Sequence, residues 1–210
     1  MNDILRKIRI LCVDDHEFIR DGISHLLRKQ PDMELIAEAK DGREAVEAYR
    51  KHRPDVVLMD LRMPNMNGIE ALGAIRDLHP HAKVIMLTTY AGDVNAAQSL
   101  KAGAAGYLLK STLRIGLIEA IRAVASGKRH VPAEIASSIA EFISSESLSV
   151  REVEVLRSVA AGNSNKAVAE LLHITEDTVK GHMRGILSKL GANDRTHALL
   201  IALKRGILET

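Results

Sequence analysis

Five side chains that together could handle a phosphoryl group stand at the ends of short apolar runs. Asp14 and Asp15 follow the first run, Asp60 follows the third, Thr88 ends the fourth and Lys110 ends the fifth. The carboxyl ends of parallel strands meet at one edge of an open sheet, where such folds bind their ligands. We therefore expect these five side chains to converge.

Their types indicate the chemistry. A carboxylate can attack phosphorus and form an acyl phosphate. Crowded acids repel one another and an incoming phosphoryl group, so a hard divalent cation such as Mg²⁺ is expected among them. Lys110 would supply a positive charge to the phosphoryl oxygens, and Thr88 a hydroxyl donor. Each residue alone has an ordinary alternative, because a strand-end aspartate often caps a helix and a lysine often faces water.

The elements that must position these residues alternate five times between residues 8 and 127. We predict strands at Ile8–Val13, Glu34–Ala39, Val56–Met59, Val84–Thr88 and Tyr107–Leu109, with helices beginning near Glu17, Gly42, Gly68, Asp93 and Leu113. Asp41 with Glu44, and Asn67 with Glu70, have the spacing of a capping box. Because the central strands are almost wholly apolar, we predict a doubly wound, five-stranded parallel sheet covered on both faces.

The pattern changes after Gly127. We assign residues 1–127 to the α/β domain, 128–147 to a linker and 148–210 to an all-α domain. In the linker, Ile135, Ile139 and Phe142 repeat at helical spacing and predict one short helix. Four helices should follow. The first opens with a capping box of Ser149 and Glu152 and ends at Gly162, and Ser164 caps the second. Thr175 caps the third, which ends at Gly191, and the last runs near Arg195–Arg205.

Composition narrows the class of protein. Hydrophobic residues make up 46% of the chain, with two Phe, three Tyr and no Trp, so the cores must be aliphatic. Because the net charge is only +2, a basic surface can exist only as a local patch. Cys12, the single cysteine, has no thiol to pair with and is expected in the core. No apolar stretch approaches the roughly 18 residues that span a bilayer, so we expect a cytoplasmic protein without membrane insertion.

The third helix of the second domain has two different faces. An apolar set should face the core: Val179, Met183, Ile186, Leu187 and Leu190. Lys180, Gly181, Arg184 and Ser188 fall on the opposite side, and no acid occurs from Thr178 to Asn193. Such a face suits the major groove of DNA, although a solvated helix face would look similar. Readers of RNA bases usually offer aromatic stacking platforms, and residues 148–210 contain no Phe, Tyr or Trp.

Residues 8–127 resemble the receiver domain of bacterial response regulators. The resemblance rests on Asp60-Leu-Arg-Met-Pro-Asn-Met-Asn-Gly68 together with Asp14-Asp15, Thr88 and Lys110. It implies that Asp60 is the phosphoacceptor and that Mg²⁺ is bound by Asp15, Asp60 and the backbone carbonyl of Arg62, with Asp14 helping through water. Thr88 would be the switch hydroxyl, and Tyr107 its aromatic partner, although an aromatic there can also be core filler.

Residues 148–191 resemble the LuxR-type helix-turn-helix, so that the whole chain is similar to the NarL/FixJ regulators. The resemblance implies contacts with double-stranded DNA by Lys166, Thr178, Lys180, Gly181, His182 and Arg184. Two features depart from the family pattern. Ala167 stands where relatives carry an acid, so the second helix should begin with a weaker cap. Gly181 and Gly185 lower helix propensity, and we interpret them as permitting close approach to DNA or as plainly tolerated.

These resemblances imply a two-component response regulator. A sensor histidine kinase would phosphorylate Asp60, and the modified protein would form a homodimer that binds specific DNA sequences and regulates transcription. Dimerisation could involve Leu199, Leu203 and Ile207 of the last helix. The alternatives are a transcription factor that acts without phosphorylation and a protein-binding output domain. An aspartyl-phosphate hydrolase usually has a second acid where this chain has Arg62, so we expect no enzyme beyond self-catalysed phosphorylation and dephosphorylation.

Overall fold

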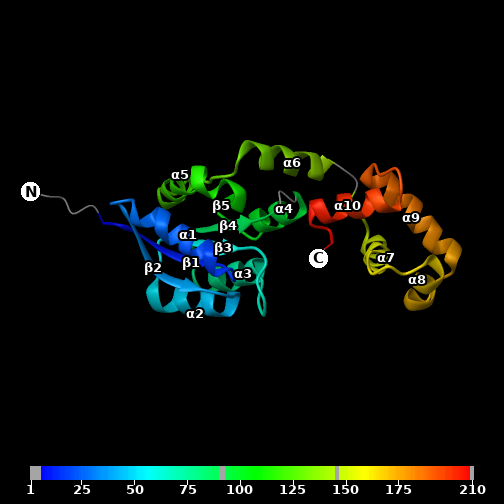
Figure 1. Ribbon diagram of the computed structural model, residues 1–210, viewed down its shortest axis with the longest axis horizontal. Coiled ribbons are helices and arrows are strands. Elements are labelled where there is room, and N and C mark those ends of the chain that lie inside the picture. Colours follow the sequence, from blue (N-terminus) through cyan, green and yellow to red (C-terminus); the bar gives the residue numbers. More distant parts are fainter. Residues whose placement is uncertain (1–5, 90–92, 145–146, 209–210) are drawn as a thin grey trace, which may run out of the picture. The chain divides into compact units, whose positions relative to one another are not determined.

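The computed structural model describes residues 6–89, 93–144 and 147–208. The chain divides into two compact units, the first mainly of residues up to Ala133 and the second mainly of residues from Glu134 onward. Figure 1 shows strands and helices in the first and helices in the second. The boundaries at 127 and 147 stay predictions.

The first unit is built on a parallel sheet of five strands. In chain order they are β1 (Ile8–Val13), β2 (Met33–Ala39), β3 (Val56–Asp60), β4 (Val84–Thr88) and β5 (Gly106–Leu109), and their spatial order is β2-β1-β3-β4-β5. The chain therefore reverses direction across the sheet between β1 and β3, which creates a topological switch point there. The predicted doubly wound sheet is confirmed.

Helices cover both faces of this sheet. They are α1 (Glu17–Arg28), α2 (Gly42–His52), α3 (Gly68–Leu78), α4 (Asp93–Lys101) and α5 (Leu113–Ala125). α1 packs against α5 and α2 against α3, and Figure 1 shows α2 and α3 on the side of the sheet away from α5. Alternate strand residues such as Ile10 and Cys12 contact the α1–α5 layer, while Leu11 and Val13 between them are also fully buried.

The predicted strand and cap positions need small corrections. β2 and β5 each begin one residue earlier than predicted, and Asp60 is the last residue of β3. Lys110 opens a 3₁₀ turn (Lys110–Thr112) after β5 rather than ending the strand. The Asn67 capping box is confirmed.

The capping box predicted at Asp41 and Glu44 is only half present. Asp41 accepts from the Glu44 backbone N–H, but the Glu44 carboxylate accepts from the backbone N–H of Lys40, one residue before the cap. The Lys40 ammonium, 3.5 Å from the other Glu44 oxygen, holds the carboxylate there.

The second unit consists of helices among the described residues. After α6 (Ala133–Ser144) come α7 (Val150–Ala160), α8 (Asn165–Leu172), α9 (Glu176–Leu190) and α10 (Arg195–Arg205). The predicted caps at Ser149, Ser164 and Thr175 are confirmed, and Gly162 and Gly191 have left-handed backbone after α7 and at the end of α9. α9 packs against α7, α8 and α10 around an aliphatic core.

The last helix lies where it was predicted, at Arg195–Arg205. Leu199, Leu203 and Ile207 are partly buried and pack against the core of the second unit. Leu200 is the exposed large apolar residue of α10. The involvement of this helix in dimerisation stays a prediction. In the part of the chain that is described, no helix is both long and apolar enough to cross a membrane.

Candidate metal centre and nucleic-acid interface

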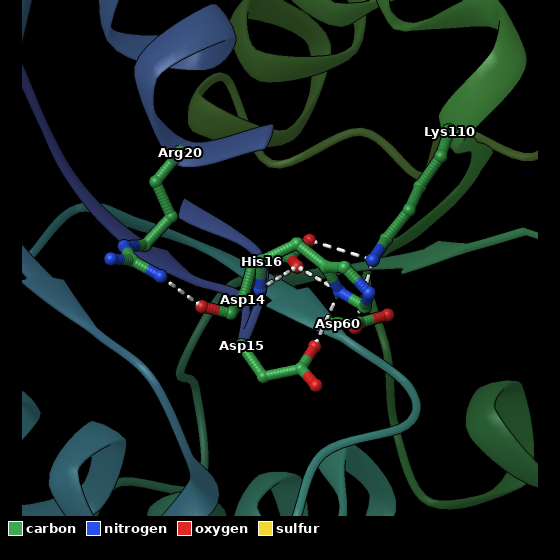
Figure 2. A network of polar contacts seen from close by, with 6 residues as sticks. All are labelled: Asp14, Asp15, His16, Arg20, Asp60 and Lys110. Atoms are coloured by element: carbon green, nitrogen blue, oxygen red, sulfur yellow. Dashed lines mark hydrogen bonds and ion pairs between the residues drawn. The ribbon is translucent and has the colours of Figure 1, made fainter. Parts of the chain in front are cut away.

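Four side chains meet beyond the carboxyl ends of β1 and β3. One ligand atom each from Asp14, Asp15, His16 and Asp60 lies within 4.8 Å of all the others (Figure 2). Asp14 and Asp60 are buried, whereas Asp15 and His16 are exposed. β1 and β3 are the neighbouring strands at the topological switch point, so the fold brings together residues 46 positions apart in the sequence (60 − 14).

Lys110 joins the two buried carboxylates. Its ammonium lies 2.7 Å from Asp14 Oδ2 and 2.8 Å from Asp60 Oδ2. Burial lowers the pKa of Lys110, but the hydrogen bonds to Asp14 and Asp60 outweigh it, and the net pKa is raised. Burial raises the pKa of Asp60 to about 6, against the opposing effect of Lys110. The buried cluster thus holds one positive charge beside two acids.

The donor set fits a hard divalent cation. Asp14, Asp15 and Asp60 offer carboxylate oxygens, the ligands that Mg²⁺ prefers. Half-buried Arg62 lies two residues beyond Asp60, in the loop that leads to α3. The structure therefore brings the three predicted acids and Lys110 together.

Thr88 and Tyr107 lie on neighbouring strands next to this cluster. Thr88 is one residue beyond Leu87, which pairs with Asp60, and Tyr107 on β5 pairs with Met86 on β4. Tyr107 is fully buried, and burial raises its pKa to about 12, while the Thr88 side chain acts in the opposite direction. The Tyr107 hydroxyl has no partner of standard hydrogen-bond geometry among the described residues, although the Thr88 side chain is near enough to lower its pKa.

Two neighbours of the cluster were not among the predicted site residues. The Arg20 guanidinium donates to the backbone carbonyl of Asp14 at 2.8 Å and pairs with Glu38 at 3.2 Å, which ties α1 to the ends of β1 and β2. His16 Nδ1 lies 2.7 Å from Asp15 Oδ1 (Figure 2). The position of His16 directly after the acid pair was an available signal. Nothing in the sequence marked Arg20, because its contacts depend on how α1 packs.

Gly68 brings the start of α3 against the end of β3. A Cβ at this position would lie 2.1 Å from the backbone oxygen of Asp60, so any side chain would displace the residue that carries the candidate nucleophile. The Gly68 N–H also donates to the carbonyl of Leu61 at 3.0 Å. The predicted role of Gly68 in shaping the turn after Asp60 thus has a steric cause.

The outer face of α9 has the predicted arrangement, but its charge is partly compensated. Lys180, Gly181 and Arg184 are exposed, whereas Val179 and Met183 are buried. Lys180 is 3.0 Å from Asp177, an exposed acid one turn earlier. In the part of the domain that is described, Arg184 is the residue of this face whose side chain forms no ion pair with an acid.

Lys189 does not belong to that face. Its ammonium lies 2.8 Å from Glu152 Oε2, and the two side chains are 22% and 9% exposed. The same Glu152 oxygen accepts from the backbone N–H of Ser149 at 2.7 Å. Burial alone would raise the pKa of Glu152. Lys189 and Ser149 together have the larger, opposite effect, so the net pKa lies below its ordinary value. Lys189 thus ties α9 to the start of α7.

The structure is consistent with the interpretation of Gly181 in α9 but corrects that of Gly185. A Cβ on Gly181 would meet nothing within 4 Å, so its outer surface is open to a ligand. A Cβ on Gly185 would lie 2.8 Å from Glu152 Oε1. Gly185 therefore makes room for the buried acid of α7, and close approach to DNA does not explain it.

The remaining predicted DNA contacts are Lys166 at the start of α8, Thr178 in the first turn of α9 and His182 near the middle of α9. Lys166 is exposed in the first turn of α8, where Ser164 caps the helix by accepting from the Ala167 N–H at 3.3 Å. Thr178 is exposed and its hydroxyl lies 2.8 Å from that of Thr175, while His182 is half-buried. The N-terminal turns of α8 and α9 thus present exposed donors.

Comparisons with known proteins match both units. Residues 10–122 match the model of the response regulator receiver domain, and residues 146–202 match that of the bacterial regulatory proteins of the luxR family. The chain is 36% identical over 223 residues to the transcriptional regulatory protein DegU of Brevibacillus brevis, covering 95% of this chain and 94% of that protein. It is 40% identical over 203 residues to LiaR of Bacillus subtilis, covering 93% and 96%.

A solved response regulator is also similar to this chain over nearly its whole length. The response regulator ChrA of a heme-sensing two-component system is 34% identical and has a TM-score of 0.59, with 97% of this chain and 100% of that chain covered. Both family models, the full-length relatives and the fold agree with the acidic cluster at the sheet edge and the helix-turn-helix that follows. The chain belongs to the NarL/FixJ family of response regulators, which join a receiver domain to a LuxR-type helix-turn-helix domain.

Proposed function

We propose that this chain is a transcription regulator whose receiver accepts a phosphoryl group on Asp60 from a sensor histidine kinase. The single observation that carries the proposal is the position of Asp60. Its carboxylate is clustered with those of Asp14 and Asp15 and contacts the Lys110 ammonium at 2.8 Å. The relatives named as transcriptional regulators, and the LuxR-type domain of this chain, support the output.

The residues have separate roles in the proposed transfer. A carboxylate oxygen of Asp60 attacks phosphorus, and the bond from phosphorus to the donor breaks with its electron pair leaving on the donor. Lys110 then holds its charge beside the phosphoryl oxygens. Mg²⁺ bound by Asp14, Asp15, Asp60 and the Arg62 carbonyl would neutralise the acids and the transferred group. Thr88 moves toward the phosphoryl group, and Tyr107 changes position with it.

On the DNA side, Lys180 and Arg184 are proposed to contact bases in the major groove, since they are exposed one turn apart on α9. Gly181 allows the backbone to approach the duplex, while Lys166, Thr178 and His182 contact phosphates. Binding by Lys180 requires it to leave Asp177, an exposed pair whose loss costs little. We place the protein in the cytoplasm and propose that it binds DNA as a homodimer once phosphorylated, because linking two half-site readers raises affinity.

Incubation with acetyl phosphate and Mg²⁺, followed by mass spectrometry, tests the phosphoacceptor. The expected product is a single phosphoryl group on Asp60 that is stable in acid and released by hydroxylamine. Asp60→Asn should abolish it, while Asp21→Asn, which removes an exposed aspartate of α1, should leave it unchanged. Labelling of Asp60→Asn at the wild-type level would show that the site is assigned to the wrong residue.

Titration of DNA at several salt concentrations tests the output. Arg184→Ala should cost about 1–3 kcal/mol and relax preference at one base position, whereas Lys166→Ala should weaken all sequences alike and lower the salt slope by about one unit. Lys204→Ala, which removes an exposed lysine of α10, is the charge-matched control. Wild-type binding by the Lys180→Ala, Arg184→Ala double variant would contradict the assignment of the groove-facing side.

A further inference from the structure

The loop that follows Asp60 has a support that the proposed chemistry does not explain. Residues 61–67, here called the acceptor loop, connect β3 to α3 and contain Arg62. The ends of the loop are fixed by backbone hydrogen bonds, from the Leu61 N–H to the Leu87 carbonyl at 2.9 Å and from the Gly68 N–H to the Leu61 carbonyl at 3.0 Å. These bonds leave its tip, Asn65 and Met66, to be held by something else.

The tip is held by the N-terminus of α2, which lies more than twenty residues earlier in the chain. Asn65 Nδ2 donates to Asp41 Oδ2 at 2.8 Å, and the Gly42 N–H donates to the Met66 carbonyl at 3.1 Å. The two contacts are adjacent on both partners, so together they fix the direction of the loop as well as its distance from α2.

Each residue of this contact has a type that the geometry requires. Asn65 has a φ of 64°, in the left-handed region that asparagine tolerates better than most residues with a side chain. A Cβ on Gly42 would lie 2.6 Å from the Met66 carbonyl oxygen, so only glycine allows that approach. The backbone conformation of Asn65 and the close approach at Gly42 therefore both favour the residue types found in this contact.

Asp41 performs two tasks with its two oxygens. Oδ1 caps α2 by accepting from the Glu44 N–H at 2.9 Å, and Oδ2 accepts from Asn65. The Glu44 N–H and the Asn65 amide hold the pKa of Asp41 below its ordinary value, so this buried carboxylate is ionised at neutral pH. The contact with Asn65 is thus a charge-assisted hydrogen bond, which is stronger than a neutral one.

We propose that Asp41 and Asn65 are positioning residues that hold the acceptor loop, and with it the Arg62 carbonyl, in the place needed for a divalent cation beside Asp60. The inference rests on the proposed function, because it assigns a supporting role at the same site. Mg²⁺ demands nearly ideal octahedral geometry. A loop anchored only at its ends would leave one ligand poorly placed, and loss of an outer contact of this kind typically lowers metal affinity tenfold or more.

The test uses Asn65→Gly in the full-length protein. Glycine keeps the left-handed backbone without strain and removes only the side-chain contact. We expect the Mg²⁺ concentration for half-maximal phosphorylation by acetyl phosphate to rise about tenfold, with the rate at saturating Mg²⁺ little changed. Titration with MgCl₂ alone, followed by the NMR shifts of amides near Asp60, should show the same rise. Without metal, the Gly42 amide should exchange with solvent faster.

A swap of the two residues separates positioning from general stability. Asn65→Asp places two carboxylates in contact and should weaken Mg²⁺ binding more than Asn65→Gly. Adding Asp41→Asn restores a donor facing an acceptor and keeps asparagine, a good N-cap, at the start of α2, so the double variant should regain most of the affinity. Val124→Ala removes buried side-chain atoms of α5, outside the acceptor loop, and it should lower stability without moving the Mg²⁺ midpoint.

The outcomes separate a failure of the positioning role from a failure of the proposed function. If wild-type protein is labelled on Asp60 but Asn65→Gly and Asn65→Asp keep its Mg²⁺ midpoint, the positioning role is refuted and the proposed function stands. An equal shift in Val124→Ala, or no recovery in the swapped variant, would also refute it, since either result means a general loss of stability. If the wild-type protein is not labelled on Asp60, the proposed function itself fails.

Discussion

Replacing Lys189 by methionine should loosen α9, the helix proposed to enter the major groove, while leaving its outer face unchanged. The substitution keeps the aliphatic stem but removes the ammonium that contacts Glu152 at 2.8 Å. Glu152 would then remain nearly buried, with the Ser149 N–H still donating to it but without its charged partner. A hydrogen bond to a charged group contributes about 1.5–3 kcal/mol. Because Lys189 is 22% exposed and solvent weakens the pair, we expect a loss of about 1.5 kcal/mol.

Hydrogen exchange of the full-length protein, resolved by peptide, measures this loss within the second domain alone. A loss of about 1.5 kcal/mol corresponds to roughly tenfold faster exchange in α7 and α9, with the receiver unaffected. Lys180→Met is the matched control, because it removes an ammonium from the same helix whose pair with Asp177 is exposed. Its exchange should match the wild type. Equal acceleration by both variants would refute the reasoning, because the burial of the pair would then play no part.

Three further changes have defined expectations. Gly181→Ala should stabilise the second domain by about 1 kcal/mol, because nothing lies near its added methyl group, while Gly185→Ala should gain less or lose stability against Glu152; thermal denaturation compares them. Gly68→Ala should cost about 1–3 kcal/mol and slow labelling of Asp60, seen by denaturation and phosphorylation assays. Because the folded pKa of Glu152 lies below its unfolded value of about 4.3, its stabilisation is complete above that pH and lost as pH falls through the folded pKa. Exchange between pH 3 and 6 should therefore depend less on pH in Lys189→Met, and an unchanged pH dependence would count against the pair.

The acidic cluster could be predicted because its members mark strand ends. Asp14, Asp15 and Asp60 each follow or finish an apolar strand, and parallel strands leave their carboxyl ends at one edge. Only the order of the strands was needed to bring them together. The caps at Ser149 and Asn67 were predictable for a related reason, since their partners lie three residues away.

Contacts that depend on how distant elements pack were not predictable in the same way. Helical spacing places Lys189 on the side of α9 away from Lys180, but only the position of α7 shows that it is paired with Glu152. Gly185 likewise has no local signal that separates room for a neighbour from room for DNA. Asn65 lies in a recognisable turn, but its partner Asp41 precedes it by a strand and a helix. Helical spacing also could not show how far Leu199 is covered, because that depends on how α10 packs against α9.

DNA footprinting across the genome, with and without acetyl phosphate and Mg²⁺, tests the central claim most directly. The account predicts that wild-type protein protects a defined set of duplex sites far more strongly when Asp60 is phosphorylated, and that Asp60→Asn shows the weak pattern under both conditions. Protection by Asp60→Asn that increases with the phosphodonor as it does for the wild type would contradict control of DNA binding through Asp60.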